Sequence, residues 1–406
     1  MKIACFSEGA LEKKGGIGIV SVPKIAQSLA NRGHQVALFM GGNPILGSEP
    51  YIQQDIDFIF ESTKESVALG AVVYSSMGNW QFAPSMIWKT ARYVKDADFI
   101  TLHSLYSFPV FVGYLLARRY DKPYGLYPHG VLSRFQRTVS VRKKAIYNIL
   151  IADQILNNAA VVFYTAQGEQ KGAQPLQIKA PSVIVPHGFD AAHYRVLPKR
   201  NRFRKKYLDN HDGPVILFLG RLNAVKGLDI LIQAFAKVVA HLPNARLLLV
   251  GSADPPKFEG IINQWLIKFS VDKHTIMTGK LVGEDKLSAF ADADIFVFPS
   301  HAENFGFAVL EAMASQLPVI VSENFDLALE IKRHEAGVVI PGDSDPSPYS
   351  KAMLELLNNS KIRKSMGENG FSLAHTYTWA KAGERIEKVI LSILYGKPLP
   401  NSLIPT

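Results

Sequence analysis

Strands that are apolar from end to end alternate with helical patterns through the second half of this chain. VILFLG at 215–220, RLLLVG at 246–251 and DIFVFPS at 294–300 are such runs, and segments with helical periodicity separate them. A strand without polar alternation is buried on both of its faces, and such strands alternating with helices form a doubly wound parallel sheet. The second half therefore predicts an α/β domain over residues 213–379.

The first half repeats this pattern less regularly, with KIACFS at 2–7, HQVALFMG at 34–41 and DFITLHS at 98–104. We expect a second α/β domain over 1–190. The polar, basic segment 191–212 predicts the linker, and the amphipathic segment near 380–396 predicts a helix that packs back on the first domain. Ligands of such sheets bind at the carboxyl ends of the strands, so we expect the site in a central cleft that the two domains face.

The composition is that of an ordinary globular protein, with 406 residues of which 48% are hydrophobic and 20% charged. The single cysteine, Cys5, excludes an internal disulfide and a cysteine-cluster metal site. No apolar run reaches transmembrane length and the first residues lack the apolar core of a signal peptide, so we expect a cytoplasmic protein. The formal net charge of +10 favours anionic partners.

The segment 134–144 concentrates positive charge without an acidic residue. Its cations are Arg134, Arg137, Arg142, Lys143 and Lys144. We hypothesise that they meet an anionic acceptor, or the inner face of the membrane as a peripheral contact; an exposed charged loop is the alternative. No nucleic-acid-binding motif accompanies this charge, and we expect no nucleic-acid partner.

The stretch HAENFGFAVLEAMA, residues 301–314, connects the end of a predicted strand to a predicted helix. The N-terminus of a helix offers backbone N–H groups and the positive end of the helix dipole, which together suit a diphosphate. Gly306 lets the backbone approach such a ligand closely. Glu311, one turn into the helix, suits the diol of a ribose, and Glu303 would face what lies beyond the phosphates.

Two cations follow another predicted strand, in GRLNAVKG at 220–227. Arg221 comes directly after the strand, and Lys226 precedes a helix. Because the carboxyl ends of parallel strands share one edge of a sheet, we expect both cations beside the predicted diphosphate site. A guanidinium binds phosphate oxygens bidentately, and a lysine adds a mobile charge.

In this order, these stretches resemble the family-4 glycosyltransferases of the GT-B fold, in which two Rossmann-like domains face a cleft. The resemblance covers most of 213–345 and also includes GKLV at 279–282 and PVIVS at 318–322. In the first half, Gly15 and Gly16 are similar to the family's phosphate-side glycine loop, and PHG at 128–130 is similar to its acceptor-domain histidine motif. The resemblance implies a retaining hexosyltransferase that uses a nucleotide-diphosphate sugar, needs no metal, and transfers to a glycan, lipid-linked or other hydroxyl acceptor.

The resemblance also implies roles for individual residues. Arg221 and Lys226 would neutralise the diphosphate leaving group, and Glu311 would hold the ribose. The remaining donor contacts would be Gly15 and Gly16 to the phosphates, Leu281 and Val282 to the nucleobase, and Glu303, Asn304, Phe305 and Gly306 to the transferred sugar. His129 would meet that sugar from the opposite domain. The implied catalytic set is His129, Glu303, Arg221 and Lys226.

Several alternatives stay open. The same fold serves nucleotide-sugar epimerases and phosphorylases, and an inactive sugar-nucleotide-binding subunit would keep it too. The Asp-x-Asp triplets at 96–98 and 292–294 lie between a helix and a strand, and the one at 343–345 lies in a polar turn, so we interpret all three as structural. His187, in VPHGFD, is interpreted as a turn residue near the hinge.

Overall fold

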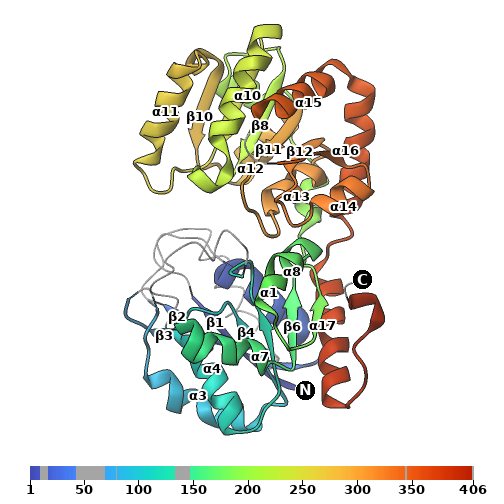
Figure 1. Ribbon diagram of the computed structural model, residues 1–406. Helices are drawn as coiled ribbons and strands as arrows, with labels where there is room; N and C mark the ends of the chain where they lie inside the picture. Colours follow the sequence, from blue (N-terminus) through green and yellow to red (C-terminus); the bar gives the residue numbers. More distant parts are fainter. Residues whose placement is uncertain (10–16, 43–68, 79, 133–146, 343–344, 405–406) are drawn as a thin grey trace. The chain divides into compact units, whose positions relative to one another are not determined.

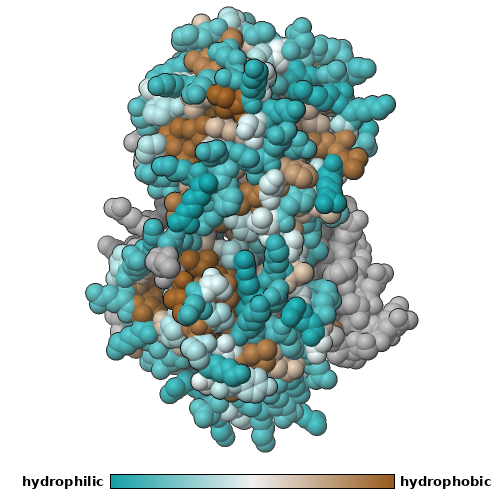
Figure 2. Space-filling view, turned by 90° about the vertical axis from the view of Figure 1, so that its right-hand side faces the viewer, coloured by the Kyte–Doolittle hydropathy of each residue, from teal (hydrophilic) through white to brown (hydrophobic). Residues whose placement is uncertain are grey.

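The computed structural model describes residues 1–9, 17–42, 69–78, 80–132, 147–342 and 345–404. The chain forms two compact units (Figure 1): Met1–Gly188 with Thr378–Thr406, and Phe189–Tyr377. Within the described ranges, every helix is too short or too polar to span a bilayer. Hydrophilic side chains cover most of the face seen in Figure 2, where hydrophobic residues gather in separate patches.

In the described part of the first unit, parallel strands form one sheet in the order β3-β2-β1-β4-β5-β6-β7. Their bounds are β1 Lys2–Glu8, β2 Gln35–Gly42, β3 Leu69–Ser75, β4 Phe99–His103, β5 Tyr124–Tyr127, β6 Val161–Tyr164 and β7 Ser182–Ile184. The chain starts in the middle of the sheet and winds toward one side and then toward the other, as in a Rossmann fold. The carboxyl ends of all these strands therefore meet at one edge.

Helices cover both faces of this sheet. On one face, α1 (Ile17–Ala30) packs with α17 (Trp379–Leu394) over a core that includes Cys5 and Ile386. On the other, α3 (Ser85–Asp96), α4 (Phe108–Arg119) and α7 (Asp153–Asn157) pack over a core that includes Phe6 and Leu102. The helix expected near 380–396 is thus α17 of the first unit.

The second unit contains a parallel sheet in the order β10-β9-β8-β11-β12-β13. Its strands are β8 Val215–Leu219, β9 Arg246–Val250, β10 Thr275–Gly279, β11 Ile295–Phe298, β12 Val319–Ser322 and β13 Gly337–Ile340. Its longer helices are α10 Leu228–His241, α11 Phe258–Lys268, α12 Gly283–Asp292, α13 Phe307–Ala314, α15 Pro346–Asn358 and α16 Ser360–Ala374. Both sheets confirm the predicted doubly wound α/β class, and strands that are apolar throughout, such as β11, are buried along their length.

Residues 191–212, expected as a linker, lie within the second unit. They include the helices η4 (Ala191–Tyr194) and α9 (Arg202–Tyr207). In α9, Arg204 is buried and donates to the carbonyl oxygens of Gly213 and Asp292 at 2.7 and 2.9 Å. These bonds fasten the segment beside the second sheet, a constraint that its polar composition did not reveal.

Candidate functional site

Two loops leave the carboxyl edge of the second sheet side by side, because β8 and β11 are paired neighbours. They comprise residues 220–227 and 299–306. Val225 joins them, since its carbonyl oxygen accepts from the Ser300 hydroxyl at 3.0 Å and from the His301 N–H at 2.8 Å. The predicted site residues of both loops are thereby held at one place.

Lys226 and Glu303 form an ion pair between these loops. Only 13% of the Lys226 side chain and 18% of the Glu303 side chain are exposed, and Nζ of Lys226 also lies 5.2 Å from the centre of the Phe298 ring. A cation shielded from water in this way attracts an anion more strongly than a solvated one does. The structure thus joins two residues that the sequence assigned to different parts of a donor.

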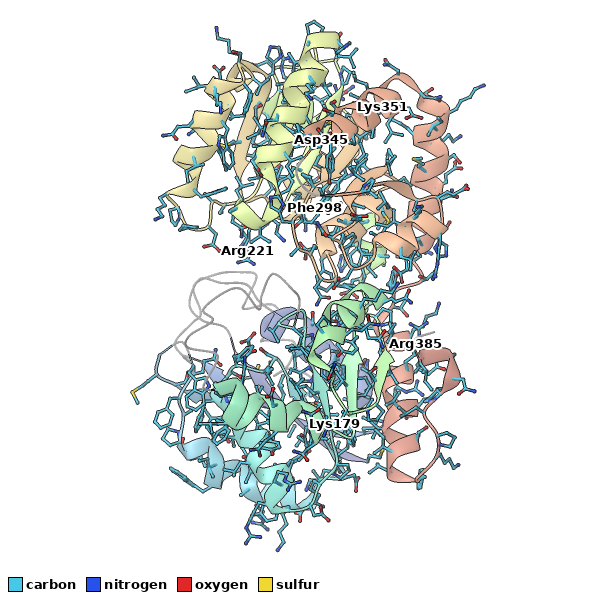
Figure 3. All side chains as sticks on the ribbon, in the orientation of Figure 1. Lys179, Arg221, Phe298, Asp345, Lys351 and Arg385 are labelled. Atoms are coloured by element: carbon cyan, nitrogen blue, oxygen red, sulfur yellow. The ribbon has the colours of Figure 1, made fainter. Side chains whose placement is uncertain are left out.

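Arg221 lies on the same edge but is more open to solvent. Its side chain is 57% exposed and donates to Oδ2 of Asp254 at 3.0 Å. Figure 3 shows Arg221 projecting from the border of the second unit. Asp254 comes from the segment after β9, the strand beside β8. A phosphate group arriving here would compete with this carboxylate for the guanidinium.

Glu311 pairs with a residue that sequence reasoning missed. Its carboxylate on α13 accepts from Nζ of Lys286 on α12 at 2.6 Å, and its side chain is 14% exposed. Helix α12 begins directly after the half-buried Leu281 and the exposed Val282. The ion pair therefore brings the predicted nucleobase segment toward the predicted ribose carboxylate. The available signal was the position of Lys286, one turn after Val282.

Gly306 precedes α13 in a left-handed conformation, with a φ of +60°. A Cβ at this position would lie 2.5 Å from a ring carbon of Phe325, so only glycine fits between the loop and the helix. The neighbouring Phe305 side chain is buried, with its ring edge-on to those of Phe307 and Tyr377. The Phe305 side chain therefore packs within the second unit and is closed to a ligand. Asn304 is half-buried.

In the first unit, His129 follows β5 at the carboxyl edge of the sheet. It is buried with a φ of +53°, and its Nε2 lies 3.0 Å from Nδ1 of His103. Its ring stacks on those of His103 and His187, with centroids 5.3 and 5.2 Å away. Burial lowers the pKa of His103 and of His187 to about 3, and burial next to these two imidazoles holds the pKa of His129 well below its usual range. All three rings are therefore neutral at physiological pH.

Sequence reasoning missed His103 and the environment of His187. His187 is predicted to be a turn residue near the hinge, and it does lie next to Gly188, where the first segment of the first unit ends. Its side chain is buried in this stack, 6.2 Å from the Trp379 ring of α17. The available signal was topological. His103 ends β4, and His129 and His187 follow β5 and β7, so all three come to the same edge of one parallel sheet.

Two of the Asp-x-Asp triplets have structural partners. Asp98 accepts from the backbone N–H of Lys2 at 2.7 Å, and Asp292 accepts from that of Phe203 at 2.7 Å. Several other predictions fall outside the described residues. They concern Gly15, Gly16, Arg134, Arg137, Arg142, Lys143 and Lys144.

Two family models match the chain. One, described as "Glycosyl transferases group 1", matches residues 199–373, and the other, described as "Glycosyltransferase Family 4", matches residues 15–193. This chain belongs to the family 4 glycosyltransferases. The predicted family and enzyme class are confirmed, and the carboxyl-edge loops of the second sheet lie within the first match of this glycosyltransferase.

Individual relatives cover most of this glycosyltransferase. A D-inositol 3-phosphate glycosyltransferase of Corynebacterium aurimucosum is 26% identical over 311 residues, which are 72% of either chain. A phosphatidyl-myo-inositol mannosyltransferase of Mycolicibacterium smegmatis is 22% identical over 395 residues, 96% of this chain and 93% of its own. The sucrose-phosphate synthase of Thermosynechococcus elongatus shares the fold, with a TM-score of 0.72 and 20% identity over 97% of this chain and 99% of its own.

Proposed function

We propose that this glycosyltransferase moves a hexose-type sugar from a nucleotide-diphosphate sugar to a hydroxyl group, with retention at the anomeric carbon and without a metal ion. The observation that carries the proposal is the shielded pair of Lys226 and Glu303 just before the N-terminus of α13. Cleavage of the bond between sugar and phosphate puts negative charge on the diphosphate. A preorganised cation and a helix dipole stabilise charge that develops in this way.

In this proposal, Lys226 exchanges Glu303 for the diphosphate when the donor binds, and Arg221 exchanges Asp254 for it in the same way. The released Glu303 carboxylate then accepts hydrogen bonds from the sugar. Backbone groups of the 299–306 loop also contact the sugar. Glu311 accepts hydrogen bonds from the ribose, and Leu281 and Val282 border the base. His129 serves the sugar as a neutral hydrogen-bonding group.

A panel of UDP-, GDP- and ADP-sugars tests this proposal and identifies the donor. We expect one sugar nucleotide to raise the Tm and to be hydrolysed slowly without an acceptor. We expect the product to keep the donor's anomeric configuration by NMR, and turnover to survive chelation of divalent metals. Inversion, dependence on a metal, or no response to any donor would contradict the proposal.

We propose an acceptor that carries phosphate. Two relatives have D-inositol 3-phosphate and phosphatidyl-myo-inositol in their names, and the net charge of +10 attracts anions to this chain. Inositol phosphates, phosphatidylinositol and a neutral oligosaccharide should be compared with the donor identified above. Transfer to the neutral acceptor alone would contradict this part of the proposal.

Exposed apolar side chains at two places on the first unit support peripheral membrane contact as a further part of this proposal. The turn after β3 exposes Met77, Trp80 and Phe82 by 68%, 36% and 40%. On α3, which packs beside α4, Trp88 is 64% exposed, and the exposed Arg92 follows it by one helical turn. Aromatic side chains beside cations suit the interface of an anionic bilayer.

Co-sedimentation with vesicles that contain an anionic lipid tests this contact. We expect Trp88→Ser to reduce the bound fraction, and neutralisation of Arg142, Lys143 and Lys144 to reduce it as well. Ile267→Ser is the matched control, because Ile267 on α11 of the second unit is 68% exposed. Equal binding by the wild type and the first two variants would rule out the contact.

A further inference from the structure

The backbone of His129 is left-handed, a conformation that residues other than glycine adopt uncommonly. Its φ is +53°, and the φ of the next residue, Gly130, is +82°. A non-glycine residue persists in this left-handed region only where the surrounding structure holds it there. Contacts from other segments must therefore stabilise the turn at the end of β5.

Glu169 supplies such a contact from α8 (Gln167–Ala173). One carboxylate oxygen accepts from the Gly130 N–H at 2.6 Å, and the other accepts from the N–H and the hydroxyl of Thr165 at 2.7 and 2.8 Å. Glu169 is 1% exposed, and all three donors are neutral. Burial of a carboxylate costs free energy unless hydrogen bonds compensate for the lost water. The three bonds to Glu169 provide this compensation, and one of them holds the backbone at Gly130 in place.

The ring of His129 is held by a second set of contacts. Its Nε2 meets Nδ1 of His103 at 3.0 Å, and Nε2 of His103 meets the Thr101 hydroxyl at 3.0 Å. A neutral imidazole donates at one nitrogen and accepts at the other, so the bond between the two rings makes the tautomer of His103 determine that of His129, and the Thr101 hydroxyl, which can donate or accept, completes the chain. The remaining atom, Nδ1 of His129, is buried, and no described group bonds it.

We propose that Glu169 and His103 are positioning residues for His129. Glu169 fixes the backbone turn, and His103 fixes the tautomer, so that His129 is held in one position and one tautomer when the reactants bind. The inference rests on the proposed function in so far as His129 takes part in transfer. A purely structural role for these residues predicts lower stability with unchanged turnover per folded molecule.

The Glu169 contact is tested by a graded series in the full-length enzyme. Glu169→Leu removes the acceptor for Gly130, and we expect kcat to fall about 100-fold, as a misplacement of about 1 Å can cause, with little change in the donor KM. Glu169→Gln keeps one acceptor oxygen and should recover most of the activity. Thr165→Val is the matched control, because it removes a bond to Glu169 but leaves the bond to Gly130. An unchanged kcat in Glu169→Leu with a lowered Tm, or an equal loss in Thr165→Val, would overturn the proposal.

The His103 contact is tested by a pair of substitutions. Asparagine places an amide near the position of Nδ1 and can still bond His129, whereas phenylalanine keeps the ring but cannot bond. We expect His103→Phe to lower kcat by about tenfold or more, and His103→Asn to lower it less. Nitrogen NMR of labelled histidine should show one tautomer of His129 in the wild type and a mixture in His103→Phe.

This spectrum needs no substrate, so it separates the two proposals. If the wild type turned over none of the donors tested, the function proposed above would fail, while the tautomer measurement would still decide the role of His103. An identical His129 signal in the wild type and in His103→Phe would overturn the positioning role even in an active enzyme. If His103→Phe failed to fold, His103→Asn would decide, because its amide can donate or accept: a mixture of His129 tautomers is expected there, and a His129 signal identical to that of the wild type would overturn the positioning role.

Discussion

The carboxyl edges of the two sheets handle charge in opposite ways. The edge of the second sheet carries ion pairs, Lys226 with Glu303 and Arg221 with Asp254. The edge of the first carries His129 in a buried stack of neutral rings. An ion pair can exchange its partner when a stronger anion arrives, whereas a buried neutral ring keeps one protonation state over a wide pH range. If the function proposed above holds, the ion pairs suit the second edge to the charged leaving group, and the neutral rings suit the first edge to an uncharged group.

Removal of Lys226 tests most directly whether the second edge binds the charged leaving group. Lys226→Ala removes the shielded cation, and we expect kcat at saturating donor to fall by about 10²–10³-fold, the range found when one transition-state donor is lost. The variant also leaves Glu303 without its partner. The double variant with Glu303→Gln is compared with Glu303→Gln alone, because Glu303 itself is proposed to bind the sugar. Equal activity of these two variants would show that the stranded carboxylate was responsible for the loss and not the missing cation.

Lowering the pH should destabilise the edge of the first sheet more than that of the second. The pKa of His103 and of His187 is about 3 in the folded chain because of burial, against 6.5 without it. Between these values the unfolded chain binds more protons, so this contribution to stability is complete above pH 6.5 and is lost as the pH falls toward 3. We therefore expect hydrogen exchange to show β4 and β5 losing protection before β8 and β11 as the pH is lowered from 7 to 4. Simultaneous loss in both sheets would contradict this expectation.

The fold could be predicted from local patterns, and the exception is instructive. Strands such as β8 and β11 can be recognised in the sequence, because each of their residues is apolar and each run ends at a polar loop. The segment 191–212 does not, because what holds it is the bond from Arg204 to the carbonyl oxygen of Asp292, 88 positions away. A basic side chain in a polar segment has the same sequence pattern whether it is solvated or fastened to a distant carbonyl group.

The same limit applies to the site. Topology places Arg221, Lys226 and Glu303 at one edge, because parallel strands share their carboxyl ends, and the sequence shows where those strands stop. The strand order does not determine which side chains form hydrogen bonds or ion pairs with these residues. That Lys286 meets Glu311, or that His103 bonds His129, depends on how each loop and helix start is turned, and nearby sequence leaves those turns undetermined.

Both edges depend on a glycine with positive φ, Gly306 in the second unit and Gly130 in the first. For Gly306→Ala, the left-handed backbone and the close Phe325 ring should lower the free energy of unfolding by about 1–3 kcal/mol. Gly260→Ala, on α11, is the control, because its Cβ would meet open space; it should raise the free energy by about 0.4–1 kcal/mol. Urea denaturation measures both, and a stabilising Gly306→Ala would show that the edge tolerates a side chain there.

Arg221 offers the smallest and most selective test of the idea that ions at the second edge exchange partners. Because its side chain is 57% exposed, the charge is screened, and Arg221→Ala should raise the donor KM by about tenfold, or about 1.4 kcal/mol, at low ionic strength. The effect should shrink as added salt shortens the Debye length. Asp254→Ala should act in the opposite direction, since it frees the guanidinium for the diphosphate without removing it. If Asp254→Ala raised the donor KM as much as Arg221→Ala does, the Arg221–Asp254 pair would be a fixed part of the loop, and among the ion pairs discussed here partner exchange would be confined to the shielded Lys226.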